Sequence, residues 1–465
     1  MYLSVEFPFM TLPTLLLYIG IAALALTALT HVFLRSTRSL FVSLLQNFTG
    51  ALFLFSGYVK AIDPLGTAYK MDQYFAEFEA TAGGAGADFL APVFPWLSGF
   101  SVQFSVFMIV LEIMLGLMLI VGAKPKLTSS LLFIIVAFFT LLTGYTYLTG
   151  YVPAGSNFFT FADWGEYAET NMKVTDCGCF GDFLKLEPRV SFLKDVALLI
   201  LAQIFLFAPN KMHQLFTSGV RSLAVLATGG LALWFSLSNF MWDLPGQDFR
   251  PFRIGTDVAA VKQAEEEAAG SVTMLGYILT NKASGEVVEM TTDEFLKVYQ
   301  DYPEAEWEYE TVSSEPTIEA TKISDFEVSD AEGNDIVPDL LADPGYTFII
   351  VAYELKGEPG RWDADYVSDW RDDIQPVVTR AEAAGHRVMA MTKFADDSFV
   401  DDFKAVVGAD YAFYRGDDIL LKTIIRSNPG VVLMHNGVIV NKWHHSRLPE
   451  FAEIAQRDIL AAVGQ

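Results

Sequence analysis

Residues 101–122 read SVQFSVFMIVLEIMLGLMLIVG and contain a single ionisable side chain, Glu112. A helix needs about 20 mainly apolar residues to cross the roughly 30 Å hydrocarbon layer of a membrane, and this stretch is long enough. The second of five further apolar stretches holds Gln46, Asn47 and Thr49, which we expect to face other helices. The sequence therefore predicts an α-helical polytopic membrane bundle of about six transmembrane helices. The five further stretches are 12–34, 40–60, 127–149, 190–208 and 221–242.

The charged residues lie mainly after the last apolar stretch. Residues 243–465 hold 42 of the 56 acidic and 19 of the 31 basic side chains, so they carry about −23 of the formal net charge of −25. The first half therefore requires a lipid bilayer as its partner, and the second half is suited to water. A nucleic-acid partner is excluded, because binding phosphates needs a positive surface.

Loop charges predict the orientation, since Lys and Arg near helix ends stay on the cytoplasmic side. The loops between helices one and two, three and four, and five and six are short and contain no Asp or Glu. The alternate loops, 61–100 and 150–189, are long and mixed in charge. We therefore expect a bacterial inner (cytoplasmic) membrane protein whose N-terminus, long loops and C-terminal region lie on the periplasmic side. The short loops carry Arg35, Arg38, Lys124, Lys126, Lys211 and Arg221.

Cys177 and Cys179 are the only cysteines, and they lie in the second long loop just before helix five. A disulfide is permitted in an oxidising compartment. A Cys-x-Cys bridge closes a very small ring, and strained disulfides are the more easily reduced. Gly178 supplies the backbone freedom that such a turn needs. A redox pair, a static bridge and two free thiols all remain open; a metal site is not expected, since no histidine is near in sequence.

Five charged residues lie in or beside the apolar stretches. Glu112 is midway along helix three, where an ionisable group is costly and is a functional candidate by default. It can move protons, or it can fix helix packing as a structural group. Lys60, Asp63, Lys194 and Asp195 are near the outer ends of helices two and five, where we expect structural pairing or snorkelling to the interface.

The membrane half resembles a known superfamily. The run Ser56-Gly57-Tyr58-Val59-Lys60-Ala61-Ile62-Asp63-Pro64 is similar to the helix-two exit of DoxX-type proteins. Glu112 before Leu-Gly-Leu, and Cys-Gly-Cys-Phe-Gly before the last core helix, resemble the MauE branch. The similarity covers about residues 40–208, and the whole layout is similar to large Bacteroidetes-type members.

The resemblance implies a redox role for Cys177 and Cys179. MauE is implicated in maturing methylamine dehydrogenase by helping disulfides to form, and DoxX relatives include a subunit associated with thiosulfate:quinone oxidoreduction. A quinone is thus the one cofactor that the resemblance suggests, and no other is evident. Nothing in the sequence indicates methylamine as a substrate.

The sequence of the C-terminal region predicts two structural parts. Residues 243–320 form a connector and a small α+β subdomain, with a helix over 257–269 and strands over 271–280, 286–290 and 306–312. We expect Thr292-Asp293 to cap a helix over 293–299. Residues 321–465 alternate strands with helices and end in a hairpin and a helix. The remaining expected segments are the first transmembrane helix (1–39), the Cys-Gly-Cys-containing bundle (40–208) and the sixth transmembrane helix (209–242).

The order over 321–465 resembles thioredoxin and TlpA-like domains. The expected strands are 326–328, 335–337, 346–353, 387–392, 411–414, 430–434 and 438–442. The expected helices are 365–384, 398–407 and 448–462, and residues 419–425 are expected to be helical or irregular. Ser427-Asn428-Pro429 is similar to the cis-proline site of that family. The segment from Glu354 to Gly360, where the family carries Cys-x-x-Cys, has no cysteine, so the resemblance implies a binding module. His435, His444 and His445 are expected to be surface or core residues.

Three functions are consistent with the sequence. The first is a thiol-redox or maturation factor acting on a periplasmic or membrane partner through Cys177 and Cys179, with Glu112 aiding proton movement. The second is a non-enzymatic membrane scaffold whose thioredoxin-like domain is a recognition module. The third is a carrier that uses Glu112, although no broken helix or internal repeat supports it.

Overall fold

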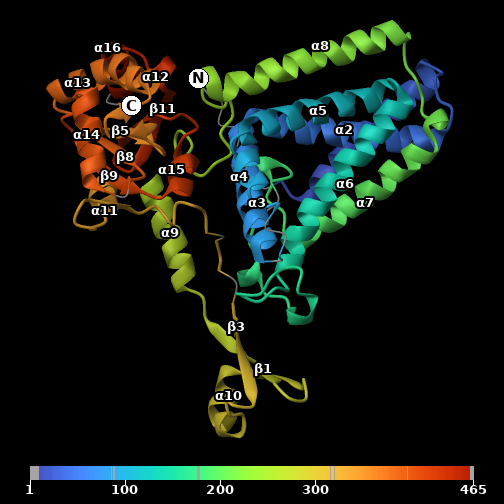
Figure 1. The fold of residues 1–465 in the computed structure, drawn as a ribbon, viewed down its shortest axis with the longest axis horizontal. Coiled ribbons are helices and arrows are strands. Elements are labelled where there is room, and N and C mark those ends of the chain that lie inside the picture. Colours follow the sequence, from blue (N-terminus) through green and yellow to red (C-terminus); the bar gives the residue numbers. More distant parts are fainter. Residues whose placement is uncertain are drawn as a thin grey trace. The chain divides into compact units, whose positions relative to one another are not determined.

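The computed structural model describes residues 10–84, 86, 89–174, 178–314, 316–318, 320–394 and 396–460. The chain forms two compact units, Met1–Phe249 and Arg250–Gln465. Figure 1 shows helices in the first unit and both helices and strands in the second.

The first unit contains the six predicted apolar helices, each long and apolar enough to cross a membrane. The prediction of a helical membrane part is therefore confirmed. Gln46 and Asn47 are buried, as expected for side chains that face other helices. Gln46 Nε2 donates to the Leu119 carbonyl oxygen at 2.6 Å. The helices are α1 with its π-helical extension (Leu12–Phe33), α2 (Leu40–Ile62), α5 (Ser101–Val121), α6 (Pro125–Thr149), α7 (Pro188–Phe207) and α8 with its extension (Ser218–Trp242).

Glycines allow α2 and α5 to approach closely. A Cβ atom on Gly116 would lie 2.7 Å from the Leu54 nitrogen, and one on Gly50 would lie 2.9 Å from the Gly116 carbonyl oxygen. Small residues permit such backbone approach where helices pack within a membrane. Helices α2 and α5 therefore pack along their lengths (Figure 1), and side chains on their facing sides can meet.

The loop predicted over 61–100 contains two helices, α3 (Pro64–Gly84) and α4 (Val93–Ser98). Asp63 begins α3, where its Oδ1 accepts from the Gly66 N–H at 3.1 Å. Proline is favoured in the first turn of a helix. Buried Leu65, Ala68 and Met71 recur at helical spacing along α3. Acidic residues follow them at Asp72, Glu77 and Glu79, and these made the segment look like a loop in the sequence.

A six-stranded mixed sheet forms the centre of the second unit, in the order β11-β10-β5-β8-β9-β4. Strands β5, β8 and β9 are parallel, and the remaining pairs are antiparallel. The strands are β4 (Val328–Ser329), β5 (Tyr346–Ala352), β8 (Arg387–Thr392), β9 (Ala412–Gly416), β10 (Gly430–His435) and β11 (Val438–His444). The helices are α11 (Val337–Leu341), α12 (Ala364–Ser368), α13 (Gln375–Ala383), α14 (Asp397–Val407), α15 (Asp418–Ile424) and α16 (Phe451–Ile454), with π-helical turns at Asp369–Ile374 and Ala455–Ile459.

The predicted α/β character of this region is confirmed, with one strand corrected. The strand expected over 335–337 is reduced to a single bridge between Ser329 and Asp335. Val337 instead begins α11, because Pro338 suits the first turn of a helix. The main apolar core surrounds Phe348, Trp370 and Phe403, all fully buried.

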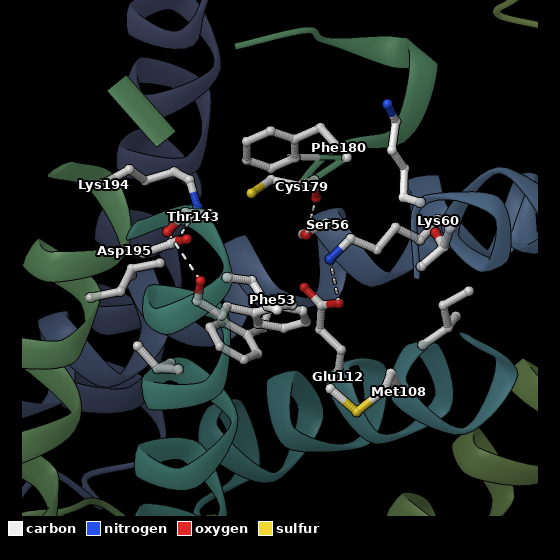
Figure 2. A pocket seen from close by; sticks show the side chains of 18 of the residues that line it. Phe53, Ser56, Lys60, Met108, Glu112, Thr143, Cys179, Phe180, Lys194 and Asp195 are labelled. Atoms are coloured by element: carbon white, nitrogen blue, oxygen red, sulfur yellow. Dashed lines mark hydrogen bonds and ion pairs between the residues drawn. The ribbon is translucent and has the colours of Figure 1, made fainter. Parts of the chain in front are cut away.

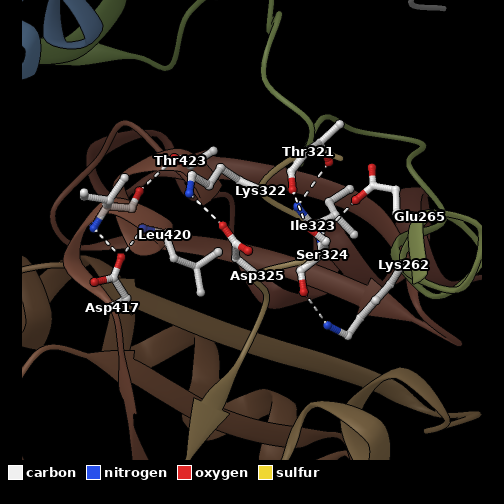
Figure 3. Close-up of polar contacts among 11 residues, drawn as sticks. Lys262, Glu265, Thr321, Lys322, Ile323, Ser324, Asp325, Asp417, Leu420 and Thr423 are labelled. Carbon is white, nitrogen blue, oxygen red and sulfur yellow. Dashed lines mark hydrogen bonds and ion pairs between the residues drawn. The ribbon is translucent and has the colours of Figure 1, made fainter. Parts of the chain in front are cut away.

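The region before this sheet contains α9 (Val258–Gly270) and a small antiparallel sheet, β2-β1-β3. Helix α9 is attached to the segment that starts the mixed-sheet region. Lys262 Nζ donates to the Ser324 carbonyl oxygen at 2.8 Å, and the Ser324 N–H donates to Glu265 Oε2 at 3.0 Å (Figure 3). The small sheet consists of β1 (Met274–Asn281), β2 (Val287–Thr291) and β3 (Trp307–Ser313).

The helix that accompanies the small sheet is α10 (Thr292–Val298), which begins one residue away from the expected cap. Thr291, not Thr292, caps it, and Glu294 completes a reciprocal capping box. The prediction of the capping residue was therefore wrong by one position. Thr291 and Thr292 offer the same hydroxyl, but only Thr291 has a glutamate three residues later to complete the box.

Candidate functional site

A pocket in the first unit brings together five of the predicted site residues from distant parts of the chain. About 870 Å³ of space, including open solvent at its mouth, is not filled by protein atoms, and α2, α3, α5, α6, α7 and the turn 178–180 line it. Figure 2 shows Lys60, Glu112, Lys194 and Asp195 around this space, together with Cys179. Phe53, Phe139 and Leu142 add apolar wall.

Lys60 and Glu112 form an ion pair across two helices. Lys60 Nζ lies 2.8 Å from Glu112 Oε2, and the two residues are only 5% and 4% exposed. The Lys60 ammonium also lies 4.8 Å from the centre of the Phe139 ring. The expectation that Lys60 would pair with a neighbouring interfacial charge or snorkel was wrong, because the close packing of α2 and α5 places Glu112 within its reach.

Lys194 and Asp195 form a second ion pair at the pocket wall, on α7. Asp195 is 3% exposed. Lys194 contacts its Oδ1, while its Oδ2 is buried and has no hydrogen-bond partner among the described residues. Asp63, the fourth predicted interfacial charge, does not line the pocket; it starts α3 instead.

Cys179 is half-buried on the turn that covers the pocket, and it forms no disulfide within the described part of the chain. Its carbonyl oxygen accepts from Ser56 Oγ at 3.0 Å, which ties the turn to α2. Gly178 has a φ of +58°, the left-handed conformation expected of it. Burial raises the pKa of the Cys179 thiol, and the Lys194 ammonium opposes this rise. Cys177, its predicted redox partner, lies outside the described residues.

The pocket includes residues that the sequence did not single out. Thr67, Lys70 and Tyr74 reach it from α3. Thr67 Oγ1 is buried without a hydrogen-bond partner among the described residues. The signal that could have found them is the apolar spacing Leu65, Ala68 and Met71 within the supposed loop, which marks one face of a helix.

In the second unit the Asn428–Pro429 peptide bond is cis, as predicted. Asn428 Nδ2 donates to the Glu354 carbonyl oxygen at 2.8 Å, so the proline turn contacts the segment after β5. That segment forms the short hairpin of β6 (Gly357–Glu358) and β7 (Arg361–Trp362). It holds no thiol, and the proline turn therefore lies beside a surface without redox side chains.

Near the proline turn, His445 meets two carboxylates. Its Nδ1 lies 2.8 Å from Asp373 Oδ2 and 3.7 Å from Asp369 Oδ1. The three ligand atoms lie within 4.8 Å of one another, close enough to share a cation. The contacts of His445 with Asp369 and Asp373 also explain this arrangement without a bound cation. The spacing of the two Asp residues by four along a helix is the signal that the sequence offered for this cluster.

Comparison with family models, curated proteins and solved structures finds no match for this chain. Its class therefore rests on the fold and the pocket. Six apolar helices indicate a membrane protein, which carries an α/β region with a mixed sheet. The pocket combines a thiol, two buried ion pairs and an apolar wall, a set that can exchange protons and electrons.

Proposed function

We propose that this protein is an integral membrane thiol-redox or maturation factor of the DoxX/MauE type, in which Cys177 and Cys179 cycle between dithiol and disulfide. The observation that carries this proposal is the position of Cys179 in one pocket with the Lys60–Glu112 and Lys194–Asp195 pairs. Perturbed and buried ionisable groups beside a reactive side chain are typical of functional sites. Oxidation joins the two sulfur atoms and releases two electrons and two protons.

The electron acceptor in this proposal is a quinone. The pocket suits its ring and oxygens, since Phe53, Phe139 and Leu142 offer apolar contact while Thr67 Oγ1 and Asp195 Oδ2 lack hydrogen-bond partners among the described residues. A bound quinone would supply the capacity to take up two electrons and two protons. Lys60 and Glu112 line the same pocket and form a pair that can exchange protons. Their 2.8 Å contact orients both side chains.

The second unit is proposed to be a thioredoxin-like partner-binding module. Its order of three parallel strands with helices between them, followed by a hairpin and a helix, supports this assignment. So does the cis Asn428–Pro429 bond before the hairpin. Because the module has no cysteine, its part in the proposed reaction is to hold a client or redox partner, and the thiol chemistry belongs to the membrane unit.

The proposed orientation puts the second unit in the periplasm and the pocket in the half of the bundle nearer the periplasm. Contacts between the short basic loops support their lying at one end of the bundle. Arg38 Nη1 donates to the Asn210 carbonyl oxygen at 3.1 Å, and the Leu215 N–H donates to the Val121 carbonyl oxygen at 2.9 Å. The pocket residues lie toward the opposite end of the bundle: Lys60 is near the end of α2, and Cys179 is on the turn that precedes α7. By the charge rule, the basic end is cytoplasmic.

Alkaline phosphatase fused after Gly255 will test this orientation. The enzyme folds with disulfides and is active only outside the cytoplasm, so we expect full activity for this fusion. A matched fusion after Lys124, in a basic loop, is expected to be inactive. Activity only in the second fusion would reverse the proposed orientation.

Removing the two thiols will test the redox proposal. The full chain is reduced, placed in lipid nanodiscs and mixed with a soluble quinone, while quinone absorbance and maleimide labelling are followed. We expect one quinone reduced per chain with loss of both free thiols. Cys177→Ser, Cys179→Ser and the double variant are each expected to reduce none.

A cysteine pair that stays reduced with quinone, or a bridge that thiol reagents cannot open, would contradict the redox proposal. The scaffold function would then be favoured, because the thiol-free second unit is suited to binding alone. Retention of the same membrane or periplasmic protein by wild type and the double-serine variant would be its positive signature.

A further inference from the structure

Asp195 presents a carboxylate oxygen that the described structure leaves unused. The residue is 3% exposed and lines the pocket, yet Lys194 contacts only Oδ1, and Oδ2 has no hydrogen-bond partner among the described residues. A buried polar atom without a partner is costly, and it calls for an explanation. A proton or a donor group that arrives during the reaction would supply the missing partner.

Cys179 faces this carboxylate. Figure 2 shows its sulfur atom directed to the side of the pocket that Lys194 and Asp195 occupy. Lys60 and Glu112 lie on the other side of the space, already paired at 2.8 Å. Lys194 also reaches the turn that carries Cys179, since its ammonium lies 5.8 Å from the centre of the Phe180 ring.

We propose that the Lys194–Asp195 pair controls the ionisation of Cys179: the thiol proton passes to Asp195 Oδ2, and Lys194 then pairs with the thiolate. This inference rests on the proposed function and assigns two positioning residues to it. The S–H bond breaks and an O–H bond forms, while no electron leaves the site. The thiolate is the nucleophilic form that thiol–disulfide chemistry requires.

Charge balance supports this route. Before the transfer the three groups carry one positive and one negative charge, and after it they carry the same. Releasing the proton to water would instead add a negative charge to a buried site, which is costly in a medium of low polarity. An internal transfer avoids that cost, and Lys194 neutralises whichever partner is ionised.

Among the described residues, the other charged groups that line the pocket come from three helices. Lys60 comes from α2, Lys70 from α3 and Glu112 from α5, while α6 contributes the uncharged Thr143. Lys70 Nζ donates to Gln73 Oε1 at 3.2 Å, and Lys60 is held by Glu112. Burial raises the pKa of Cys179; Lys194 opposes that rise and Asp195 adds to it, so the two residues have opposite signs of effect.

Alkylation of Cys179 by iodoacetamide will test the inference, with the full chain in lipid nanodiscs and Cys177→Ser as the background. The rate is measured from pH 6 to 10, since it follows the thiolate fraction. Lys194→Gln is expected to slow the reaction at pH 7 by about tenfold or more, equivalent to a rise of at least one pKa unit. Asp195→Asn is expected to make the rate rise about tenfold per pH unit below the thiol pKa, because the proton must then leave to water, whereas internal transfer in the wild-type protein releases no proton and leaves the rate nearly independent of pH.

Matched controls separate charge from folding. Lys185→Gln and Glu187→Gln remove the same charges from exposed positions just before α7, and each is expected to change the rate by less than about twofold. Lys194→Arg keeps the cation and is expected to retain most of the wild-type rate. In SDS-unfolded chains all variants should react alike.

An unchanged or faster reaction in Lys194→Gln, or a wild-type rate that rises with pH as steeply as that of Asp195→Asn, would overturn the inference. The measurement needs neither Cys177 nor an electron acceptor, so it is independent of the quinone assay. The expected loss of rate in Lys194→Gln and the expected change of pH dependence in Asp195→Asn, together with a cysteine pair that never cycles, would keep this inference and remove the proposed function. Quinone reduction together with unchanged alkylation would do the reverse.

Discussion

Replacing Lys60 by methionine will destabilise the membrane unit by about 3–5 kcal/mol, the cost typical of removing one partner from a buried ion pair. Methionine keeps most of the lysine volume, so the loss comes from leaving Glu112 charged and unpaired. Lys60 and Glu112 are 5% and 4% exposed, and water cannot readily replace the lost contact. Resistance to unfolding by SDS in bicelles, at constant pH, measures the change.

The double variant Lys60→Met with Glu112→Leu decides the cause. Replacing both members of a buried pair by apolar groups is often neutral or stabilising, so we expect most of the lost stability to return. Lys185→Met, at an exposed loop position, is the matched control and should change stability by less than about 0.5 kcal/mol. A double variant as unstable as Lys60→Met would show that packing, and not charge pairing, holds α2 against α5.

Truncating Phe403 to alanine will destabilise the second unit by about 3–5 kcal/mol, as expected for removing a fully buried aromatic side chain. Its ring lies 4.9 Å from Trp362 and 5.2 Å from Trp370, centre to centre, in edge-to-face contacts. Such aromatic pairs stabilise the fold beyond what the burial of apolar area alone contributes. Pulse proteolysis of the full chain in increasing urea, with detection of a C-terminal tag, measures the loss.

Phe399→Ala is the matched control for Phe403→Ala. Phe399 lies one turn earlier on α14, is only half-buried, and contacts Trp362 at 4.9 Å. We therefore expect about half the effect or less, because the transfer and cavity costs both grow with burial. Equal losses for the two variants would contradict the assignment of Phe403 to the core and Phe399 to its edge.

Both predictions concern side chains whose importance depends on distant neighbours, although the elements that carry them were predictable. The apolar stretches 12–34, 40–60, 101–122, 127–149, 190–208 and 221–242 each became a helix within a few residues of the expected bounds. In the second unit, the strand over 387–392 was predicted with its observed bounds. Length, composition and periodicity act locally, so one sequence is sufficient to recognise them.

The errors have local causes too. Helix α3 was missed because Asp72, Glu77 and Glu79 conceal an amphipathic pattern that resembles a polar loop. The cap of α10 was misplaced by one residue because two adjacent threonines offer the same hydroxyl. In both cases the residue types alone were ambiguous. Packing of its apolar face identifies α3, and the reciprocal contacts of Thr291 with Glu294 identify the cap of α10.

By itself the sequence determined that this chain has about six membrane-spanning helices, an acidic α/β region and two cysteines before the fifth apolar helix. The tertiary structure decided which charges meet. Lys60 and Glu112 are 52 residues apart in the chain, and their pairing depends on the close approach that Gly50 and Gly116 allow between α2 and α5. The Asp195 oxygen that lacks a hydrogen-bond partner among the described residues was equally invisible in the sequence, because such an oxygen can be recognised only from the positions of its neighbours in the fold.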